Sequence, residues 1–413
     1  MTKELLGIAL RNITRNRRRT ILNVIALTVG MTIMIIALGW IRGYFTTLYQ
    51  GMITLDTGEV QVLHRSYLAE QRRTPLDLLV DGELAQRLAE EQLPEQLSKF
   101  SAVTRRIEYE AELGNGREYM PMRGRGVDPG LEPEITTIQE SIVAGSYLEA
   151  GGQGVLIGVE AARLLDLAAG DAVFIRVRDR FGAPNTVSTR VQGIFATGYP
   201  LFDRALLQTD ISWSAESLRT GEGVTHLVGR LDGRANRALA RQVAAQLDSI
   251  LPEEVQAYPW ERFARTMVAA VEADMSAFVI LLGIIFLLVM LGILNSMSMT
   301  VHEREQEIAT MRAIGMKKRQ LRWLLLAESA FLAVLAALLA WIFGGAMALY
   351  VQQVGFDISG FLPPELPIPF GDRFYGDYRI GDLFGTALVG VIITLAGTIV
   401  PARQAALKPP YQQ

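Results

Sequence analysis

The chain has 413 residues, of which 50% are hydrophobic and 20% charged, and its formal net charge is −3. It contains no cysteine, which excludes disulfide bonds and thiolate metal sites. The three histidines, His64, His226 and His302, lack metal-ligand spacing, so we interpret them as ordinary polar residues. The small net charge decides nothing about partners, because it averages basic and acidic stretches that are expected to face different compartments.

The first 20 residues are basic and contain the stretch LLGIALRNI, which places Leu6, Leu10 and Ile13 on one helical face. This pattern is typical of a helix that lies on a membrane surface. We therefore expect a cytoplasmic amphipathic helix over residues 1–20. A basic tail that only sets the orientation of the next segment is the alternative, and the sequence leaves both open.

Four stretches are long and apolar enough to cross a membrane. A span needs about 20 apolar residues, because the hydrocarbon core is about 30 Å thick and a helix rises about 1.5 Å per residue. The predicted spans are 21–45, 274–299, 323–350 and 381–401. The apolar part of the first is longer than the ~7–15 residues of a signal peptide, and no small-residue cleavage site follows it. We therefore predict that it is retained.

Lysine and arginine residues predict the orientation of the spans. They gather before the first span, between the second and third, and after the fourth, whereas the loop 351–380 holds only Arg373 and Arg379. Both termini, with the tail 402–413, and the loop 300–322 are therefore predicted to be cytoplasmic. Residues 46–273 and the loop 351–380 are predicted to lie on the other side, which is the periplasm in a Gram-negative cell.

The segment 46–273 has a mixed pattern of strands and helices. SAVTRRIEYEAEL and REYMPMRGRGV read as strands joined at Gly114-Asn115-Gly116, which is a hairpin signal. Because the first pattern resumes after residue 221, we predict one subdomain over 46–127 and 222–260, with a second, 128–221, inserted into it. Residues 42–54 and 260–276 have helical spacing and should extend the first two spans outward. The fold class is thus four transmembrane α-helices plus an inserted extracytoplasmic α/β (α+β) domain with two subdomains.

The loop 300–322 carries the most specific pattern in the chain. It contains HEREQEIATMRAIGMKKRQ, which resembles the loop at this position in ABC transporter permeases of the MacB/FtsX type, with their ERxxEIAxxRAIG core. The ending PARQAALKPP resembles that family's PAxxAAxxxP ending, although Lys408-Pro409-Pro410 stand where relatives usually carry an acidic residue. GVLIGVEAARLLDLAAGDAVFI is similar to the family's periplasmic core, whose Porter and Sabre subdomains would match the two subdomains above. Within this family, the segment TGEVQVLHRSY is more similar to the lipoprotein-releasing branch, LolC and LolE.

The resemblance implies that this chain functions in a complex with other proteins. Two such permeases pair, as a homodimer or with a paralogous permease, above a dimer of ABC ATPase subunits. The loop 300–322 would form a coupling helix on the ATPase, through Glu303, Arg304, Glu307, Ile308, Met311, Arg312, Ala313, Ile314 and Gly315. Since the chain has no GxxxxGK(S/T) phosphate loop, we expect ATP and Mg²⁺ on the partner ATPase, no cofactor on this chain, and no enzyme activity in it.

The residues of this loop suit such a contact. Acidic residues open the predicted helix and Lys317, Lys318 and Arg319 follow it, which complements the helix dipole. Ile308, Met311, Ile314 and Met316 form an apolar strip suited to docking in a partner's groove. The alternative is a solvated loop that only sets topology.

Glu328 is the one charge in the third span, and a charge at the membrane centre costs about 2.5–3.5 kcal/mol. We expect a structural contact, with Arg322, Arg18 or a partner permease, rather than a proton relay. The chain shows no nucleophile elbow, and its basic residues flank the spans, so neither catalysis nor nucleic-acid binding is expected.

Three functions stay open within the resemblance, all in the bacterial inner membrane. The first is release or export of lipoproteins, or of another amphipathic substrate, with membrane lipids and a periplasmic carrier as further partners. The second is tripartite efflux of drugs or peptides with an adaptor protein. The third is FtsX-like mechanical regulation of a cell-wall hydrolase, for which the outer domain is large.

Overall fold

The computed structural model describes residue 7 and residues 17–90, 100–232, 236–357 and 373–407. These residues divide into two compact units. The membrane unit consists of the described residues up to Thr46 and from Ala270 on, and the outer unit of those within Thr47–Ala269. The predicted helix over residues 1–20 lies outside the described residues, apart from Gly7 and the first residues of the first long helix.

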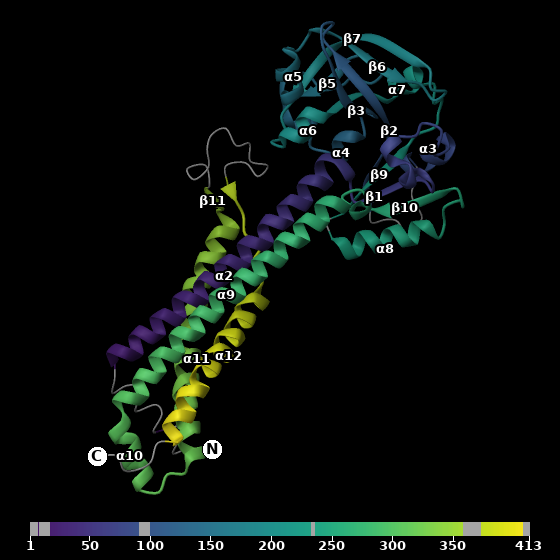
Figure 1. Ribbon diagram of the computed structural model, residues 1–413. Coiled ribbons are helices and arrows are strands. Elements are labelled where there is room, and N and C mark those ends of the chain that lie inside the picture. The colour runs from purple at the N-terminus through teal and green to yellow at the C-terminus, as the bar shows by residue number, and fades with distance from the viewer. Residues whose placement is uncertain (1–6, 8–16, 91–99, 233–235, 358–372, 408–413) are drawn as a thin grey trace. The chain divides into compact units, whose positions relative to one another are not determined.

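Four long helices dominate the membrane unit among the described residues: α2 (Arg17–Met52), α9 (Arg265–Glu303), α11 (Lys318–Gln353) and α12 (Ile380–Leu407) (Figure 1). Each is long and apolar enough to cross a membrane, which confirms the four predicted spans. A short helix, α10 (Glu305–Ala313), connects α9 to α11, and the two-residue strands β11 (Phe356–Asp357) and β12 (Arg373–Phe374) pair between α11 and α12.

Small residues let α2, α11 and α12 approach one another closely. Gly344 of α11 lies against Ile35 of α2, where an added Cβ would come within 2.9 Å of the isoleucine side chain. Ala337 and Ala340 join the same buried cluster, together with Met31. Because lipid tails are as apolar as leucine, such close van der Waals packing is what holds membrane helices together.

The outer unit is built on one mixed sheet. Its strands are β1 (Val60–His64), β2 (Phe100–Gly114), β3 (Tyr119–Val127), β4 (Ile142–Gly145), β5 (Val155–Gly158), β6 (Ala172–Arg178), β7 (Pro184–Phe195), β8 (Leu206–Asp210), β9 (His226–Leu231) and β10 (Val255–Pro259). They follow the order β10-β1-β9-β2-β3-β8-β5-β7-β4. Strand β6 pairs with both β2 and β7, so that β2, β3, β8, β5, β7 and β6 close into a ring.

The long strand β2 joins the two predicted subdomains. It pairs with β9 over Phe100–Arg106 and with β6 over Ala111–Gly114, so both subdomains share one sheet. The hairpin predicted at Gly114-Asn115-Gly116 is present as the antiparallel pair β2–β3, and Gly116 has the positive φ of 87° that such a turn requires. The boundary between the subdomains stays a prediction.

Short helices cover the sheet: α3 (Gly82–Glu90), α4 (Glu132–Ile135), α5 (Val159–Leu165), α6 (Pro200–Ala205), α7 (Ile211–Leu218) and α8 (Arg237–Asp248). The core between them and the sheet contains fully buried side chains such as Tyr109, Leu113, Ile175 and Trp260. A π-helical turn, η1 (Ile53–Thr57), follows α2 directly and carries Asp56.

Candidate functional site

The predicted coupling residues lie at the turn from α9 through α10 to α11. Glu303 ends α9, Arg304 leaves helical geometry with φ −98° and ψ 18°, and α10 begins at Glu305. Glu307, Ile308, Met311, Arg312 and Ala313 are in α10, and Ile314 follows it. Gly315 has φ 105°, a conformation that glycine adopts without a steric penalty, and it ends the turn.

Arg304 is buried, and its guanidinium holds the turn against α11. Its Nη1 donates to Oε2 of Glu328 at 2.9 Å, and its Nε donates to Oε2 of Glu307 at 3.1 Å. Arg304 is 8% exposed and Glu328 is 7% exposed, so this is a buried ion pair that needs both members. From the sequence we named Arg322, Arg18 or a partner permease for Glu328 and missed Arg304, which is 24 residues away, between α9 and α10.

The apolar strip predicted for partner docking is divided. Ile308 is buried among residues of the same chain, including Leu321 and Leu325 of α11 and Ala405 of α12, and Met311 and Met316 pack against this cluster. Ile314 is 82% exposed. The expectation that the whole strip faces a partner is therefore wrong, because the ends of α11 and α12 are themselves apolar and α10 covers them.

A hydrogen bond fixes the other end of α10. Nη1 of Arg312 donates to the backbone carbonyl of Ala406 in α12 at 3.0 Å. With the Arg304–Glu328 pair, this contact fastens both ends of α10 to the membrane unit. What stays accessible is a surface of Ala313, Ile314 and Gly315 followed by Lys317, Lys318 and Arg319, which suits a partner with an apolar depression and an acidic rim.

The outer unit holds a network of buried ion pairs that the sequence did not reveal. Arg106 makes two hydrogen bonds to Glu132, at 3.0 and 2.7 Å, and Arg125 of β3 bonds to Glu108 of β2 at 2.7 Å. Asp56 of η1 pairs with both Arg123 and Arg125. The network therefore fastens η1, the continuation of α2, to the centre of the sheet.

Burial and charge shift the titration of this network in opposite ways. Burial alone would raise the pKa of Glu108, but Arg125 and Arg123 hold that pKa at about 2. Burial also lowers the pKa of His226, which lies beside Glu108, to about 4. At neutral pH Glu108 is thus charged and His226 is neutral, and neither is poised for proton transfer near pH 7.

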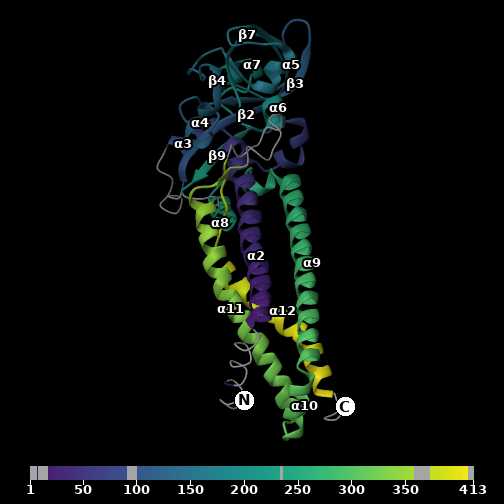
Figure 2. The same ribbon diagram turned by 90° about the vertical axis from the view of Figure 1, so that its left-hand side faces the viewer.

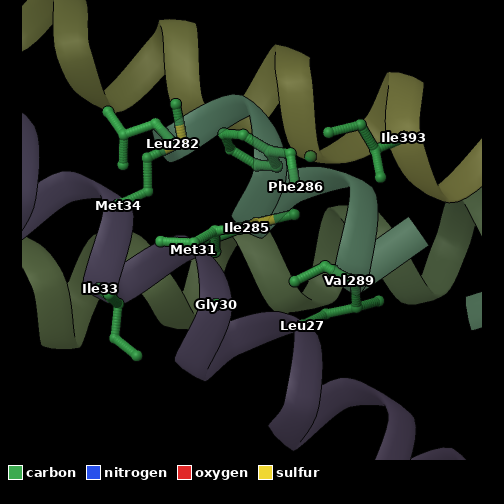
Figure 3. A pocket seen from close by; sticks show the side chains of 11 residues that line it. Leu27, Gly30, Met31, Ile33, Met34, Leu282, Ile285, Phe286, Val289 and Ile393 are labelled. Atoms are coloured by element: carbon green, nitrogen blue, oxygen red, sulfur yellow. The ribbon is translucent and has the colours of Figure 1, made fainter. Parts of the chain in front are cut away.

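The membrane unit contains an apolar pocket between α2, α9 and α12 (Figure 3). Leu27, Met31 and Met34 of α2 face Leu282, Phe286 and Val289 of α9 across it. The residues that line it are all apolar and offer no group that would bind a polar ligand, and the pocket is only about 20 Å³ in volume. Within the described ranges, no cluster of three or more His, Cys, Asp or Glu side chains is arranged to hold a metal ion.

Comparison with protein families gives two matches along the chain. The model of the MacB-like periplasmic core domain matches residues 20–248, and that of the FtsX-like permease C-terminal matches residues 279–410. The first alone spans more than half of the chain. The second includes α10 and the turn around it.

Two relatives agree with these matches in sequence. The lipoprotein-releasing system transmembrane protein LolC of Xylella fastidiosa is 24% identical over 319 residues, which is 73% of this chain and 74% of that protein. The macrolide export ATP-binding/permease protein MacB of Psychrobacter cryohalolentis is 21% identical over 96% of this chain and 57% of its own length. The crystal structure of the periplasmic region of MacB from Actinobacillus actinomycetemcomitans covers 53% of this chain and 94% of that one, with 13% identity and a TM-score of 0.36.

Proposed function

Since the chain belongs to the MacB/FtsX family of ABC transporter permeases, we propose that it couples ATP hydrolysis by a separate ATPase to movement of its outer unit. The observation that carries this proposal is the turn at Ile314. An exposed isoleucine and a basic rim lie beside a helix whose two ends are fastened to α11 and α12. A push on this turn would therefore reach the membrane helices instead of only bending a loop.

The partners follow from this role. A dimer of ABC ATPase subunits binds ATP and Mg²⁺ and contacts the turn on the cytoplasmic side. A second permease, identical or paralogous, completes the membrane assembly. Both termini are then cytoplasmic, and the outer unit lies in the periplasm, since the basic residues of the turn favour the inner side.

For the substrate, we propose lipoproteins or another amphipathic molecule, released from the inner membrane. The similarity to LolC over most of both chains supports it. Export of a drug or peptide with an adaptor is the second candidate, because the similarity to MacB extends over 96% of this chain.

The test is co-purification of the full chain with the ABC ATPase encoded beside it, for the wild type and for Ile314→Asp. Burying an isoleucine contributes about 1.5–3 kcal/mol, so its loss should weaken the complex roughly 10- to 100-fold. Ile250→Asp is the matched control, because Ile250 is a half-exposed isoleucine of the outer unit. Full ATPase association and coupled activity in Ile314→Asp would show that the turn is not the coupling site. Mass spectrometry of material bound to the wild-type complex then distinguishes lipoprotein from drug or peptide.

A further inference from the structure

The outer part of α2 carries a notch that only glycine can form. Gly39 and Gly43 are one turn apart and lie on the same face of the helix. A Cβ at Gly39 would overlap the ring of Tyr378, and one at Gly43 would overlap the carbonyl oxygen of Tyr375 and lie 2.9 Å from the nitrogen of Asp377. The segment that leads into α12 therefore touches the backbone of α2.

Polar contacts hold the segment in this notch. The backbone N–H of Asp377 donates to the carbonyl of Gly39 at 3.0 Å. Arg42 makes two hydrogen bonds to the carboxylate of Asp382 in the first turn of α12, at 2.5 and 3.0 Å. Asp382 is shielded, with 13% of its side chain exposed, which makes the pair less subject to screening than a surface pair. We call Tyr375–Asp382 the clamp segment.

A third helix is tied to the same place. The indole Nε1 of Trp341 in α11 donates to the carbonyl of Leu383 in α12 at 2.8 Å. Because Leu383 follows the clamp segment directly, α2, α11 and α12 are linked to one another at one level of the membrane unit. Below this level the same three helices share the buried cluster of Met31, Ile35 and Ala340.

Helix α9 is held quite differently over its outer half. Every residue from Glu272 to Leu281 is exposed, whereas α2 from Met31 to Thr46 is exposed only at Ile33 and Trp40. Among the described residues, the aromatic contact between this half of α9 and α2 is the edge-on pair Phe45–Phe278, with ring centroids 6.5 Å apart. In Figure 2, α2 lies between α11 and α9.

The inner half of α9 makes specific contacts with α2 and α12. Oγ of Ser296 donates to Oδ1 of Asn23 at 2.6 Å, and Gly397 of α12 lies against the backbone of Met290. The small apolar pocket of Figure 3 adjoins this region, with Met34 and Leu282 among the residues that line it. Within the membrane unit, the contacts that hold α9 to α2 and α12 are thus concentrated in its inner half, whereas the residues from Glu272 to Leu281 are exposed.

We propose that the clamp segment makes α2 move as one body with α11 and α12, so that α2 is the fixed pivot of the outer unit and α9 is the helix that moves against it. Arg42, Asp382 and Gly43 are then positioning residues for coupling. This inference rests on the proposed function, because it states which of the two helices leading to the outer unit carries the motion. It departs from the simpler expectation that both helices act as equivalent levers.

Thiol cross-linking tests the asymmetry, since the chain contains no cysteine of its own. In the complex with the ATPase and the second permease, the two thiols of Arg42→Cys/Asp382→Cys are linked by bifunctional reagents of graded length. A covalent cross-link then replaces the ion pair. Phe45→Cys/Phe278→Cys is linked in the same way. The first link should leave ATP-driven substrate release within about 2-fold of the uncross-linked wild-type complex. The second should lower it at least 10-fold. Loss of release with the first link, or full release with the second, would overturn the proposal.

Substitutions test the clamp segment without any cross-link. Arg42→Asp should uncouple ATP hydrolysis from release, and Arg42→Asp/Asp382→Arg should restore coupling, because the pair is re-formed with its charges exchanged. Gly43→Ala should uncouple as well. Gly385→Ala is its matched control, because nothing lies within 4 Å of a Cβ placed at Gly385. Absence of rescue by the charge exchange would contradict the clamp.

One readout is independent of transport. The yield of the shortest Arg42→Cys/Asp382→Cys link, measured on the full chain in membranes, should be high and should fall several-fold when Gly43→Ala is added. An unchanged yield would refute the clamp, whatever the substrate. If the wild-type chain binds no ATPase but the yield falls as expected, the proposed function fails while the clamp stands.

Discussion

Removing one member of the buried Arg106–Glu132 pair should destabilise the outer unit far more than removing a comparable surface charge. Arg106 and Glu132 have 1% and 0% of their side chains exposed, and two hydrogen bonds join them. Glu132→Gln leaves the guanidinium buried without this carboxylate, and breaking such a pair costs about 3–5 kcal/mol. With a urea dependence of about 2 kcal/mol per molar, the unfolding midpoint should fall by about 2 M.

The assay is urea unfolding of the full chain in detergent micelles, followed by tryptophan fluorescence, since Trp213 and Trp260 are buried in the outer unit. Glu160→Gln is the matched control. It breaks the pair with Arg163, whose side chain is 69% exposed, and should cost at most about 1 kcal/mol.

The double variant Arg106→Met/Glu132→Leu gives the decisive comparison. It removes both charges, and well-packed apolar replacements of a buried pair are often neutral, so it should be more stable than Glu132→Gln. The reasoning is refuted if Glu132→Gln matches the surface control, or if the double variant is less stable than the single one. Loss of the hydrogen bond from Arg106 to the carbonyl of Asp56 should also loosen η1.

Two further predictions concern buried charged or titratable side chains. Because burial lowers the pKa of His226 to about 4, the unfolded chain binds this proton more readily than the folded one between pH 4 and about 6.5. The free energy of unfolding of the outer unit should therefore fall by up to roughly 3 kcal/mol as the pH falls through this window, and His226→Asn should make it less dependent on pH. An equal pH dependence in both proteins would contradict this prediction. Glu328→Gln should leave Arg304 without its partner in α11 and so loosen α10. Trypsin should then cleave after Lys317 several-fold faster than in the wild type. An unchanged cleavage rate would contradict the attachment of α10 to α11.

The spans and the hairpin could be predicted because each depends on neighbouring residues alone. A run of about 20 apolar residues needs no knowledge of the rest of the fold to specify a membrane helix. The turn at Gly114-Asn115-Gly116 likewise depends on positive backbone angles that glycine supplies locally. The pairing of β6 with both β2 and β7 is not local, and nothing in the strand patterns predicted a closed ring.

The pairs that organise the membrane unit were missed because they join distant parts of the chain. Arg42 and Asp382 are 340 residues apart, and Gly39 and Gly43 are indistinguishable in sequence from ordinary glycines of a membrane helix. The strip around Ile308 shows a second limit of prediction from sequence. Periodicity identifies which side chains of a helix are apolar, but not whether the surface that covers them belongs to the same chain or to another.

The division of that strip bears directly on how the turn would work. A helix that contacted a partner with its whole apolar face would be free of its own chain and would transmit little force. Here Ile308 packs α10 against Val301 of α9 and against α11 and α12, and Ile314 stays exposed. Since the clamp segment joins α12 to α2 at the other end of the bundle, a push at Ile314 acts on three linked helices at once. Helix α9, which ends at Glu303 just before the turn, is then the helix that changes position relative to these three.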